Sequence, residues 1–443
     1  MTSSAVPAPA PGVVSPLDAV TLRTDFPILS EEVNGHRLVY LDSAATSQKP
    51  LAVLDAERDF LTHANAAVHR GAHTLAAEAT DLFEDSRAAV AGFVGAQPDQ
   101  LVWTSGATAG LNLVAYAIGN ATLGRGAPAS ARFALAPGDE IVTTAIEHHA
   151  NLIPWQELAA RTGAVLRHIP ARADGTLDLD AAASLIGERT RIVAFTHVSN
   201  VLGIVNPVAE LVALAEAVGA TTVLDACQSA PHLPLDLPAL RVDLAVFSGH
   251  KMLGPYAIGG LYGRAEVLEA LPPFLTGGSM ITTVTLEGAE YLPPPQRFEA
   301  GTQPVGPAIG LAEAVRYLDR VGLENIHAHE SALAERMAAG LREIPGIRLL
   351  GDAAGVDRVG LWSFDVAGVH AHDAGQFLDA QGIAVRVGHH CAAPLHRQFG
   401  MTASVRASTA LYNTEDDVDL FLDAVRGIRG FFGVTDEAEG ARA

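Results

Sequence analysis

Short apolar runs alternate with helical stretches along most of the chain, and this alternation limits the possible fold more than any other feature. The helical stretches carry apolar residues at spacings of three and four, for example over residues 55–68 and 79–95. The short runs, QLVWT, DEIVTT, RIVAFTHV, TTVLDA and DLAVFS, are bounded by turn residues, as buried parallel strands are. Strands that alternate with helices predict an α/β protein with right-handed crossovers. Residues 120–137, rich in Ala, Gly and Pro, interrupt the alternation and predict a surface loop.

The composition divides the chain into two tails and two domains. Residues 1–22 are rich in Ala, Pro and Ser and predict a disordered N-terminal tail, and residues 434–443 predict a short C-terminal tail. Residues 41–305 hold the short apolar runs and are expected to form a large domain. Long helical patterns followed by a second set of short strands favour a smaller α/β domain over residues 306–433, to which we also assign residues 23–40.

The net charge excludes several kinds of partner. The chain has 50 acidic and 29 basic residues, a formal charge of -21. A nucleic-acid-binding protein needs a basic surface to displace counterions from phosphates, and an anionic membrane surface would repel this chain. We also find no apolar run long enough to span a bilayer. We therefore expect neither a nucleic-acid partner nor a membrane partner.

The cysteine content indicates a reducing compartment. Two cysteines, Cys227 and Cys391, are too few for a disulfide framework in a chain of this length, and a reducing cytoplasm is the simplest setting. The N-terminus, MTSSAVPAPAPGVV, has no basic n-region and no apolar h-region, so we expect no secretory signal.

Two charged residues follow neighbouring strands of the expected sheet. Asp225 ends the run TTVLDA, where a carboxylate can pair with a protonated ring nitrogen, although a strand-end Asp is more often a helix cap. Lys251 follows DLAVFS and can form a Schiff base, although an exposed surface lysine is the simpler interpretation. Ser248 and His250 flank Lys251 and could reach a phosphate. Ligands on such sheets collect at the carboxyl ends of strands, where all four residues are expected.

Two further turns at the same edge favour a flat, phosphorylated cofactor. After QLVWT, a Gly-rich turn leads into an apolar helix, whose first N–H groups suit a phosphate, and Thr108 adds a hydroxyl. After DEIVTT, His148 could stack on a flat ring or transfer protons. Each motif alone also fits an ordinary surface turn. Their joint occurrence with an acid and a lysine at one sheet edge is what indicates a cofactor.

Cys391 is the candidate nucleophile. It lies in the stretch RVGHHCAAP, where Arg386, His389 and His390 supply positive charge that favours the reactive thiolate. Metal binding by the His-His-Cys run is the alternative, but adjacent ligands rarely fit one tetrahedral site, and we expect no metal there. Cys227 is expected to be a small buried residue behind the cofactor.

These stretches together resemble the cysteine desulfurases, fold-type I pyridoxal-phosphate enzymes of the class V aminotransferase group. The resemblance is strongest to the SufS-type branch, which includes selenocysteine lyases, and NPVAE, DACQS and RVGHHCAAPLHRQFG are similar to actinobacterial members. It extends from about Phe26 to Phe432 and includes NAAVHRGAHTLA, EHHANLIPWQ, THVSNVLG, SGHKMLGP, RFEAGT and RASTALYNT. The resemblance implies a large domain with a mostly parallel seven-stranded sheet and a smaller C-terminal α/β domain that carries the cysteine loop.

The resemblance also implies how pyridoxal 5'-phosphate is held. Lys251 forms the Schiff base and later moves protons, Asp225 pairs with the ring nitrogen, Gln228 bonds the ring oxygen, and His148 stacks on the ring. The phosphate is held by a shared set of groups, one of them from the neighbouring subunit of a homodimer: Ala107, Thr108, Ser248 and His250, with Thr302 from the partner. Members of the group often have a second hydroxyl where Ala107 stands and a small residue where Cys227 stands.

The substrate implied by the resemblance is L-cysteine, which is converted to L-alanine while a persulfide forms on Cys391. Arg406 pairs with the substrate carboxylate through its planar guanidinium. Asn200, Arg386 and His69 complete the expected substrate site.

The implied destination of the sulfur is iron–sulfur cluster assembly of the SUF type, with a zinc-bearing SufU-type protein as the acceptor. His372, in GVHAHDAG, is a candidate zinc ligand at the docking surface, and a solvated surface histidine is the alternative. Two other functions stay open. The chain could be a selenocysteine lyase, for which Cys391 need not be essential, or an inactive scaffold in a cluster-assembly complex, although Lys251, Asp225 and Cys391 are all present.

Overall fold

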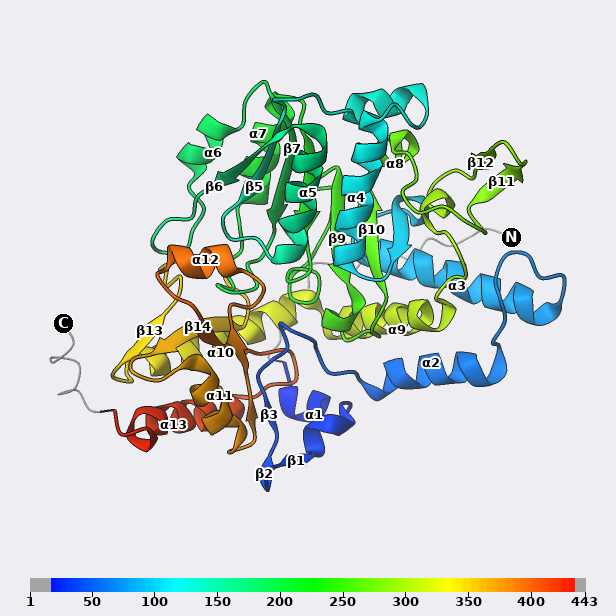
Figure 1. The fold of residues 1–443 in the computed structure, drawn as a ribbon. Coiled ribbons are helices and arrows are strands. Elements are labelled where there is room, and N and C mark those ends of the chain that lie inside the picture. The colour runs from blue at the N-terminus through cyan, green and yellow to red at the C-terminus, as the bar shows by residue number, and fades with distance from the viewer. Residues whose placement is uncertain (1–16, 435–443) are drawn as a thin grey trace.

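A seven-stranded sheet forms the centre of the larger of two lobes (Figure 1). The structure is a computed structural model that describes residues 17–434. Strand β10 runs antiparallel to both of its neighbours, and the other adjacent pairs are parallel, which confirms the predicted mostly parallel sheet. In sheet order the strands are β4 (Leu101–Thr104), β10 (Gly259–Gly263), β9 (Leu244–Ser248), β8 (Thr221–Asp225), β7 (Thr190–Thr196), β5 (Glu140–Thr144) and β6 (Val165–Ile169).

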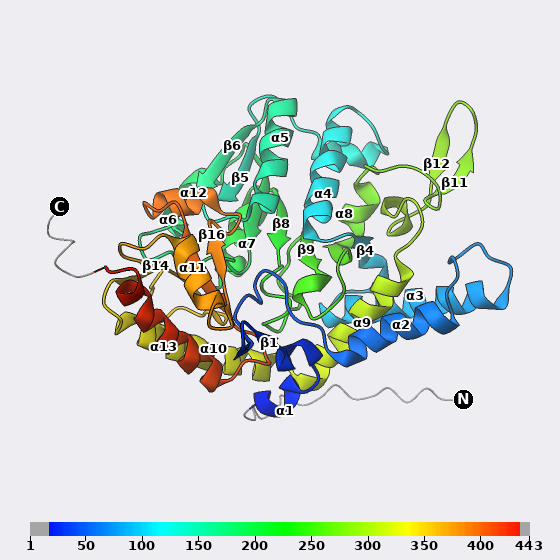
Figure 2. The ribbon, with the colours of Figure 1, turned by 60° about the horizontal axis from the view of Figure 1, so that its bottom comes forward.

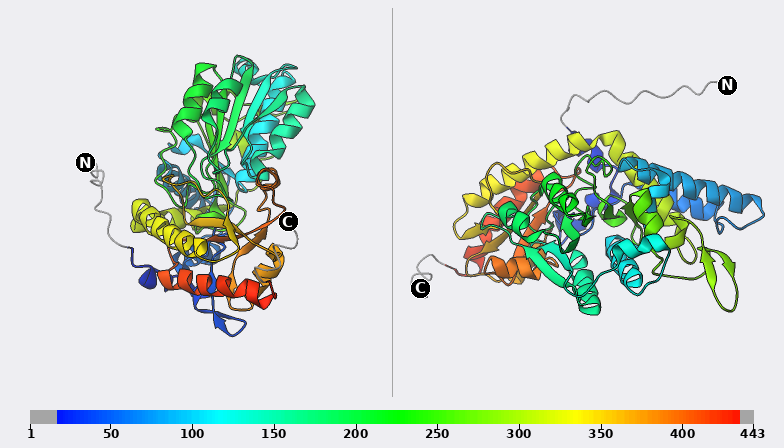
Figure 3. Two further views of the ribbon diagram at one scale, coloured as in Figure 1. Left: turned by 90° about the vertical axis from the view of Figure 1, so that its left-hand side faces the viewer. Right: turned by 90° about the horizontal axis from the view of Figure 1, so that it is seen from above.

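The central strands are apolar on both faces because helices cover both faces (Figure 3). In β7, Ile192 and Ala194 pack into one buried cluster, while Val193 and Phe195 pack into another on the opposite face. This is why these strands appear in the sequence as continuous apolar runs. One face carries α4 (Ala107–Thr122), α5 (Ile153–Thr162) and α8 (Ala265–Ala270); the other carries α3 (Thr74–Phe93), α6 (Leu179–Leu185) and α7 (Val208–Ala217).

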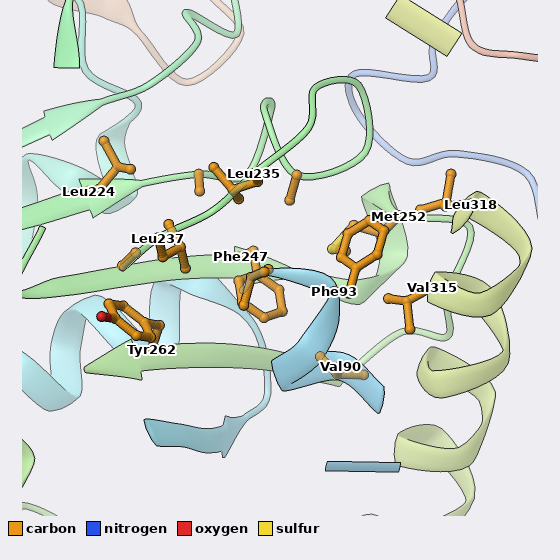
Figure 4. Packing of buried hydrophobic residues seen from close by; sticks show 14 of the residues in the cluster. Val90, Phe93, Leu224, Leu235, Leu237, Phe247, Met252, Tyr262, Val315 and Leu318 are labelled. Atoms are coloured by element: carbon orange, nitrogen blue, oxygen red, sulfur yellow. The ribbon is translucent and has the colours of Figure 1, made fainter. Parts of the chain in front are cut away.

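A long helix connects the large lobe to the rest of the chain. Helix α9 (Val305–Val321) packs along α3 and α2 (Leu51–His63). Figure 4 shows Phe93 of α3 between Phe247 of β9 and Val315 of α9, all of them buried. The expected domain boundary at residues 305 and 306 therefore coincides with the start of a helix that belongs by packing to the large lobe.

The smaller lobe is an antiparallel sheet covered by helices. Its strand order is β13 (Ile347–Leu349), β14 (Leu361–Val366), β17 (Ser404–Ser408) and β16 (Arg386–Gly388). Beside it, β3 (Val39–Tyr40) pairs in parallel with β15 (Ile383–Ala384), so an early segment of the chain joins the C-terminal lobe. The helices are α10 (Leu323–Arg342), α11 (Ala371–Asp379), α12 (Ala393–Gln398) and α13 (Glu415–Phe431).

Two segments are more ordered than the sequence predicts. Residues 1–16 and 435–443 of the expected tails lie outside the described residues, but α1 (Ala19–Arg23), apart from its last residue, falls within the expected N-terminal tail. It forms because Asp18 caps it by accepting a hydrogen bond from the Thr21 N–H at 3.1 Å, and because Arg23 pairs with the buried Asp417 at 3.1 Å.

The expected surface loop at residues 120–137 is largely anchored. Helix α4 continues to Thr122, and Pro128–Phe133 forms a 3-10 helix. The Ser130 hydroxyl donates to the carbonyl of Ala270 at 2.7 Å, and Phe133 and Leu135 are buried in the core. The prediction of a surface loop from composition was therefore wrong for much of this segment, because two of its apolar side chains pack into the core.

Two hairpins extend from the lobes. Strand β1 (Glu32–Val33) pairs with β2 (His36–Arg37) on the small lobe. Strand β11 (Ile281–Val284) pairs with β12 (Ala289–Tyr291) in a hairpin that projects from the large lobe (Figure 2). No helix within residues 17–434 combines the length and the apolar character that a membrane crossing requires.

A buried ion pair holds α3 to the segment after the hairpin. Arg87 is 1% exposed and Glu299 8% exposed; their two N–O distances are 2.6 and 2.9 Å, and Glu299 also accepts the Trp103 N–H at 2.8 Å. Arg87→Met leaves a buried carboxylate without its bidentate partner. We expect it to lower the free energy of unfolding by about 3–5 kcal/mol, measured by urea denaturation. Arg58→Met, at an exposed pair on α2, is the control; equal stability of the two variants would contradict the prediction.

Candidate active site

The carboxyl ends of the parallel strands open into a cavity of about 370 Å³. Residues from the large lobe form most of its wall, and the loop between β16 and α12 of the small lobe closes it. Most of the predicted site residues line this cavity: Ala107, Thr108, His148, Asn200, Asp225, Gln228, Ser248, His250, Lys251, Arg386, Cys391 and Arg406.

The register of two neighbouring strands brings the acid and the lysine to one edge. Asp225 is the last residue of β8 and pairs in parallel register with Val246 of β9. Strand β9 ends at Ser248, and the short 3-10 helix η5 (Gly249–Lys251) follows it directly. The sequence prediction that both side chains share one sheet edge is therefore matched by the geometry.

Asp225 is suited to a protonated ring nitrogen. Its side chain is buried, and Oδ1 accepts the Cys227 N–H at 3.0 Å, which fixes the carboxylate at the cavity wall. Cys227 is buried as predicted, with its Sγ 3.6 Å from the Ser248 Oγ. Burial, together with the charge of Asp225, raises the pKa of the Cys227 thiol to about 12, so this thiol stays protonated.

A glycine turn and a helix N-terminus form the end of the cavity that suits a phosphate. Gly106 caps α4 with a φ of 134°, and a Cβ there would lie 3.2 Å from the Ser248 Oγ. The first N–H groups of a helix have no intrahelical acceptor, so they can bind an anion. The Ala107 N–H already donates to the Ser248 Oγ at 2.9 Å, so the anion-binding role predicted for it would require that bond to change.

His250 supplies an unsatisfied nitrogen beside this turn. Its ring stacks on Tyr256 with 5.8 Å between the ring centroids, and its Nδ1 is buried and without a partner among residues 17–434. Burial and the charges of Lys251 and Lys49 lower the pKa of His250 to about 4, so the ring is neutral. An orphaned buried nitrogen at this position fits a bound cofactor atom. Gln228, predicted to bond the ring oxygen, donates to the carbonyl of Ala44 at 2.8 Å.

His148 presents a neutral ring to the cavity. Burial, followed by the charge of Lys251, lowers its pKa to about 4. Its Nδ1 accepts the Ala150 N–H at 3.0 Å, which fixes the ring. A neutral, fixed imidazole is suited to the predicted stacking on a flat cofactor.

A buried arginine marks the opposite end of the cavity. The Arg406 Nη1 donates to the carbonyl of Asn200 at 2.9 Å, and Nη2 lies 3.4 Å from Asp42. Its Nε has no partner within the described chain. Burial lowers the pKa of Arg406 to about 10, so it still carries its charge at neutral pH. A buried guanidinium with an unused donor suits a substrate carboxylate.

Some predicted residues lie elsewhere. Thr302 is exposed and lines a separate cavity, together with Trp103 and Phe298. His69 bonds to Glu84 at 2.9 Å and does not line the active-site cavity. His372 is exposed on α11 of the small lobe.

Sequence reasoning missed two carboxylates at the site. Asp42 contacts Arg406 and also pairs with Arg386 at 2.7 Å. Glu147 is buried and accepts hydrogen bonds from Thr144, Asn151 and the Thr196 N–H at 2.6, 2.6 and 3.0 Å, and burial raises its pKa to about 8. Glu147 immediately precedes His148 in the turn after β5. That position, next to a predicted site residue, is the sequence signal that could have identified it.

His149 holds the cysteine loop and was also missed. Its N–H donates to the carbonyl of Cys391 at 2.7 Å, and its Nε2 accepts the Ala393 N–H at 3.2 Å. The loop is strained, because His390 and Cys391 have φ values of 50° and 56°, a region that favours glycine. The strained loop is thus fastened to the large lobe by a turn next to His148.

The comparisons with known proteins agree with this geometry. The model of the family described as "Aminotransferase class-V" matches residues 39–421. A probable cysteine desulfurase 2 from Mycobacterium leprae is 55% identical over 425 residues, which covers 95% of this chain and 99% of the relative.

Solved structures agree with the sequence matches. The apo cysteine desulfurase from Thermococcus onnurineus NA1 is similar with a TM-score of 0.86 and 38% identity, over 94% of this chain and 99% of that one. A C-DES mutant with glycine covalently linked to its PLP cofactor is similar with a TM-score of 0.76 and 25% identity, over 92% of this chain and 99% of that one.

The fold and the site define the class of protein as a pyridoxal-phosphate-dependent enzyme, and the predicted cofactor is confirmed. The chain belongs to the aminotransferase class-V family. The predicted resemblance to cysteine desulfurases, including actinobacterial ones, is also confirmed.

His149 generates a pH-dependent prediction. Burial and the charges of His389 and Arg397 lower the pKa of His149, so its Nε2 accepts a hydrogen bond at neutral pH. As the pH falls through that pKa, the ring protonates and this hydrogen bond is lost. We expect His149→Ala to speed amide hydrogen exchange of the 389–393 loop roughly 3- to 10-fold at about pH 8. The ratio to wild type should fall toward one only as the pH decreases well below the ordinary histidine pKa of 6.5 and through this lowered pKa, because the wild-type ring then also protonates.

His149→Gln is the matched variant for this experiment. Its amide oxygen is an acceptor that does not titrate, so its loop should exchange like wild type at high pH and more slowly than wild type at low pH. A ratio for His149→Ala that stays constant with pH would contradict the prediction. His63→Ala, on the exposed end of α2, should leave loop exchange unchanged.

Proposed function

We propose that this enzyme removes sulfur from L-cysteine, releases L-alanine and holds the sulfur as a persulfide on Cys391. The observation that carries the proposal is the shared cavity of the exposed Cys391 thiol, Lys251 and the buried Arg406. In the reaction the substrate carbon–sulfur bond breaks and a sulfur–sulfur bond forms. The electron pair left on carbon takes up a proton to give alanine, so no external oxidant is required.

The residues at the strand ends fit pyridoxal phosphate. When bound, the cofactor supplies an electron sink for the substrate α-carbon. Lys251 would hold its aldehyde and carry the proton between the α-carbon and the β-carbon. Asp225 would keep the ring nitrogen protonated, and the neutral ring of His148 would stack on the cofactor face. The turn at Gly106, with Thr108, Ser248 and His250, would hold its phosphate.

The small lobe supplies substrate orientation and the sulfur acceptor. The Arg406 guanidinium is oriented by the Asn200 carbonyl and by Asp42, so it can bind the substrate carboxylate without reorganising. Cys391 follows β16 in the same lobe, and Arg386 lies beside it in the cavity wall. Binding at Arg406 would therefore place the substrate sulfur within reach of the Cys391 loop.

A homodimer would complete the site. Thr302 is exposed and does not line the cavity of its own chain, which supports the expectation that it serves the neighbouring subunit. The β11–β12 hairpin projects beside this segment (Figure 2), and Val284 and Leu286 on it are exposed, as is Leu275. Exposed apolar side chains on a projecting hairpin are what an interface between copies would cover.

We place the enzyme in the cytoplasm, in iron–sulfur cluster assembly of the SUF type, with a SufU-type zinc protein as its acceptor. The two free thiols and the similarity to actinobacterial relatives support this placement. His372 is exposed at the start of α11, on the same lobe as Cys391, and its imidazole is open to a metal on a docking partner.

Cys391→Ser tests the proposed nucleophile. Serine cannot accept sulfur, so we expect alanine formation from cysteine to fall by at least about 100-fold, measured by alanine release. Borohydride should still fix the cofactor to Lys251 in this variant, which shows that the rest of the site is intact. Alanine release at the wild-type rate would show that Cys391 is not the acceptor.

His372→Ala tests the acceptor. If His372 ligates a partner's zinc, the variant should lose about tenfold or more of the stimulation that a SufU-type protein gives, while turnover without the carrier stays unchanged. The measurement is sulfide release from cysteine across a series of carrier concentrations. His63→Ala, an exposed histidine on the large lobe, is the control; the same stimulation of all three proteins would eliminate the zinc-ligand role.

A further inference from the structure

We infer that Lys49 is a positioning residue for Lys251, because its ammonium group fixes the peptide carbonyl that precedes Lys251 in the chain. This inference rests on the proposed role of Lys251 in holding the cofactor. It adds a second lysine, from a distant segment, to the machinery of the site.

The composition first singles out Lys49. The sequence contains two lysines, Lys49 and Lys251, and every other basic residue among its 29 lysines and arginines is arginine. Positions in this chain that need only a positive charge therefore carry arginine. Lysine stands where Schiff-base chemistry is proposed, and at one other position, whose ammonium contacts the carbonyl of the residue before Lys251.

The contact is a four-donor clamp on one carbonyl oxygen. The carbonyl of His250 accepts the Lys49 ammonium at 2.9 Å, the Thr46 hydroxyl at 3.0 Å, and the N–H and hydroxyl of Ser47, both at 3.1 Å. The Ser47 hydroxyl oxygen also accepts the Leu253 N–H at 2.8 Å. The segment between β3 and α2 therefore forms hydrogen bonds to the backbone both before and after Lys251.

The charge of Lys49 is poorly compensated. No carboxylate within residues 17–434 lies at ion-pair distance from it; the Tyr256 ring lies 5.2 Å from its Nζ and also stacks on His250. The ionisable groups around it are His250, Lys251, Tyr256 and, through Thr46, Tyr40. Burial lowers the pKa of Lys49 to about 8. A partly buried cation without an ion-pair partner costs folding free energy, so stability alone does not explain it.

The chemistry of the clamp explains why the residue is lysine. An ammonium concentrates its charge on one atom and turns its three donors freely, so in a crowded space it can donate to two backbone carbonyls, those of Ser47 and His250. A guanidinium spreads its charge over a planar fork that matches carboxylates. Holding the His250–Lys251 peptide restricts the position of the Lys251 Cα and therefore of its side chain. Such ordering of a reacting group supplies a large part of an enzyme's rate enhancement.

The test separates positioning from folding. In Lys49→Met holoenzyme, we expect pyridoxal phosphate to dissociate roughly 3- to 10-fold faster, followed by its absorbance. In wild type the dissociation rate should rise as the pH increases through about 8, where Lys49 loses its charge, and in Lys49→Met it should stay flat over that range. Lys49→Arg should not restore the wild-type profile.

The melting temperature of the protein distinguishes a positioning role of Lys49 from a merely structural one. With the cofactor fixed to Lys251 by borohydride, cofactor loss cannot affect unfolding. Lys49→Met should then melt no lower than wild type, because it removes a partly buried cation that has no ion-pair partner among residues 17–434. A lower melting temperature together with an unchanged pH profile would show a merely structural role and overturn the inference. Neither measurement uses cysteine, so the outcome is independent of whether Cys391 accepts sulfur.

Discussion

The seven-stranded sheet is buried on both faces, so a polar side chain in the large lobe can meet a ligand only where a strand ends. This constraint places Asp225, Ser248 and the turn at Gly106 at one edge of the sheet, although their segments are far apart in the sequence. Burial then sets their chemistry. The rings of His148 and His250 are held neutral, and the guanidinium of Arg406 keeps its charge, so each is in the state that the proposed reaction requires.

The two lobes meet at the cavity through a small number of polar contacts. Asn200 and His149 of the large lobe bond the cysteine loop, while within the small lobe Asp42 pairs with Arg386 and Arg406. The strained backbone of that loop is stable only because these neighbours hold it. The strand ends that would hold the cofactor are therefore rigid, and the loop that carries the proposed sulfur acceptor is held by contacts that a proton or a partner can change.

The sequence predicted the features that local pattern determines. Continuous apolar runs identified the buried strands, and polar residues after those runs identified Asp225 and Lys251. Residues whose role depends on a contact across the chain were not predicted. Lys49 touches the carbonyl of a residue 201 positions away, and Asp42 contacts an arginine 364 positions away. No periodicity or spacing carries such information, and helix α1 escaped prediction for the same reason, because its arginine is held by Asp417.

The two thiols of the chain differ in position rather than in residue type, and position is what favours Cys391 as the proposed nucleophile. Cys227 lies closer along the chain to the acid of the cofactor site than Cys391 does, yet burial and the charge of Asp225 keep its thiol protonated. Cys391 is exposed and lines the same cavity as Arg386 and Arg406. A persulfide on Cys227 would form on a buried residue in the wall of the cavity, away from the surface where an acceptor protein could bind. The proposed persulfide on Cys391 would form on an exposed residue, which transfer to a second protein requires.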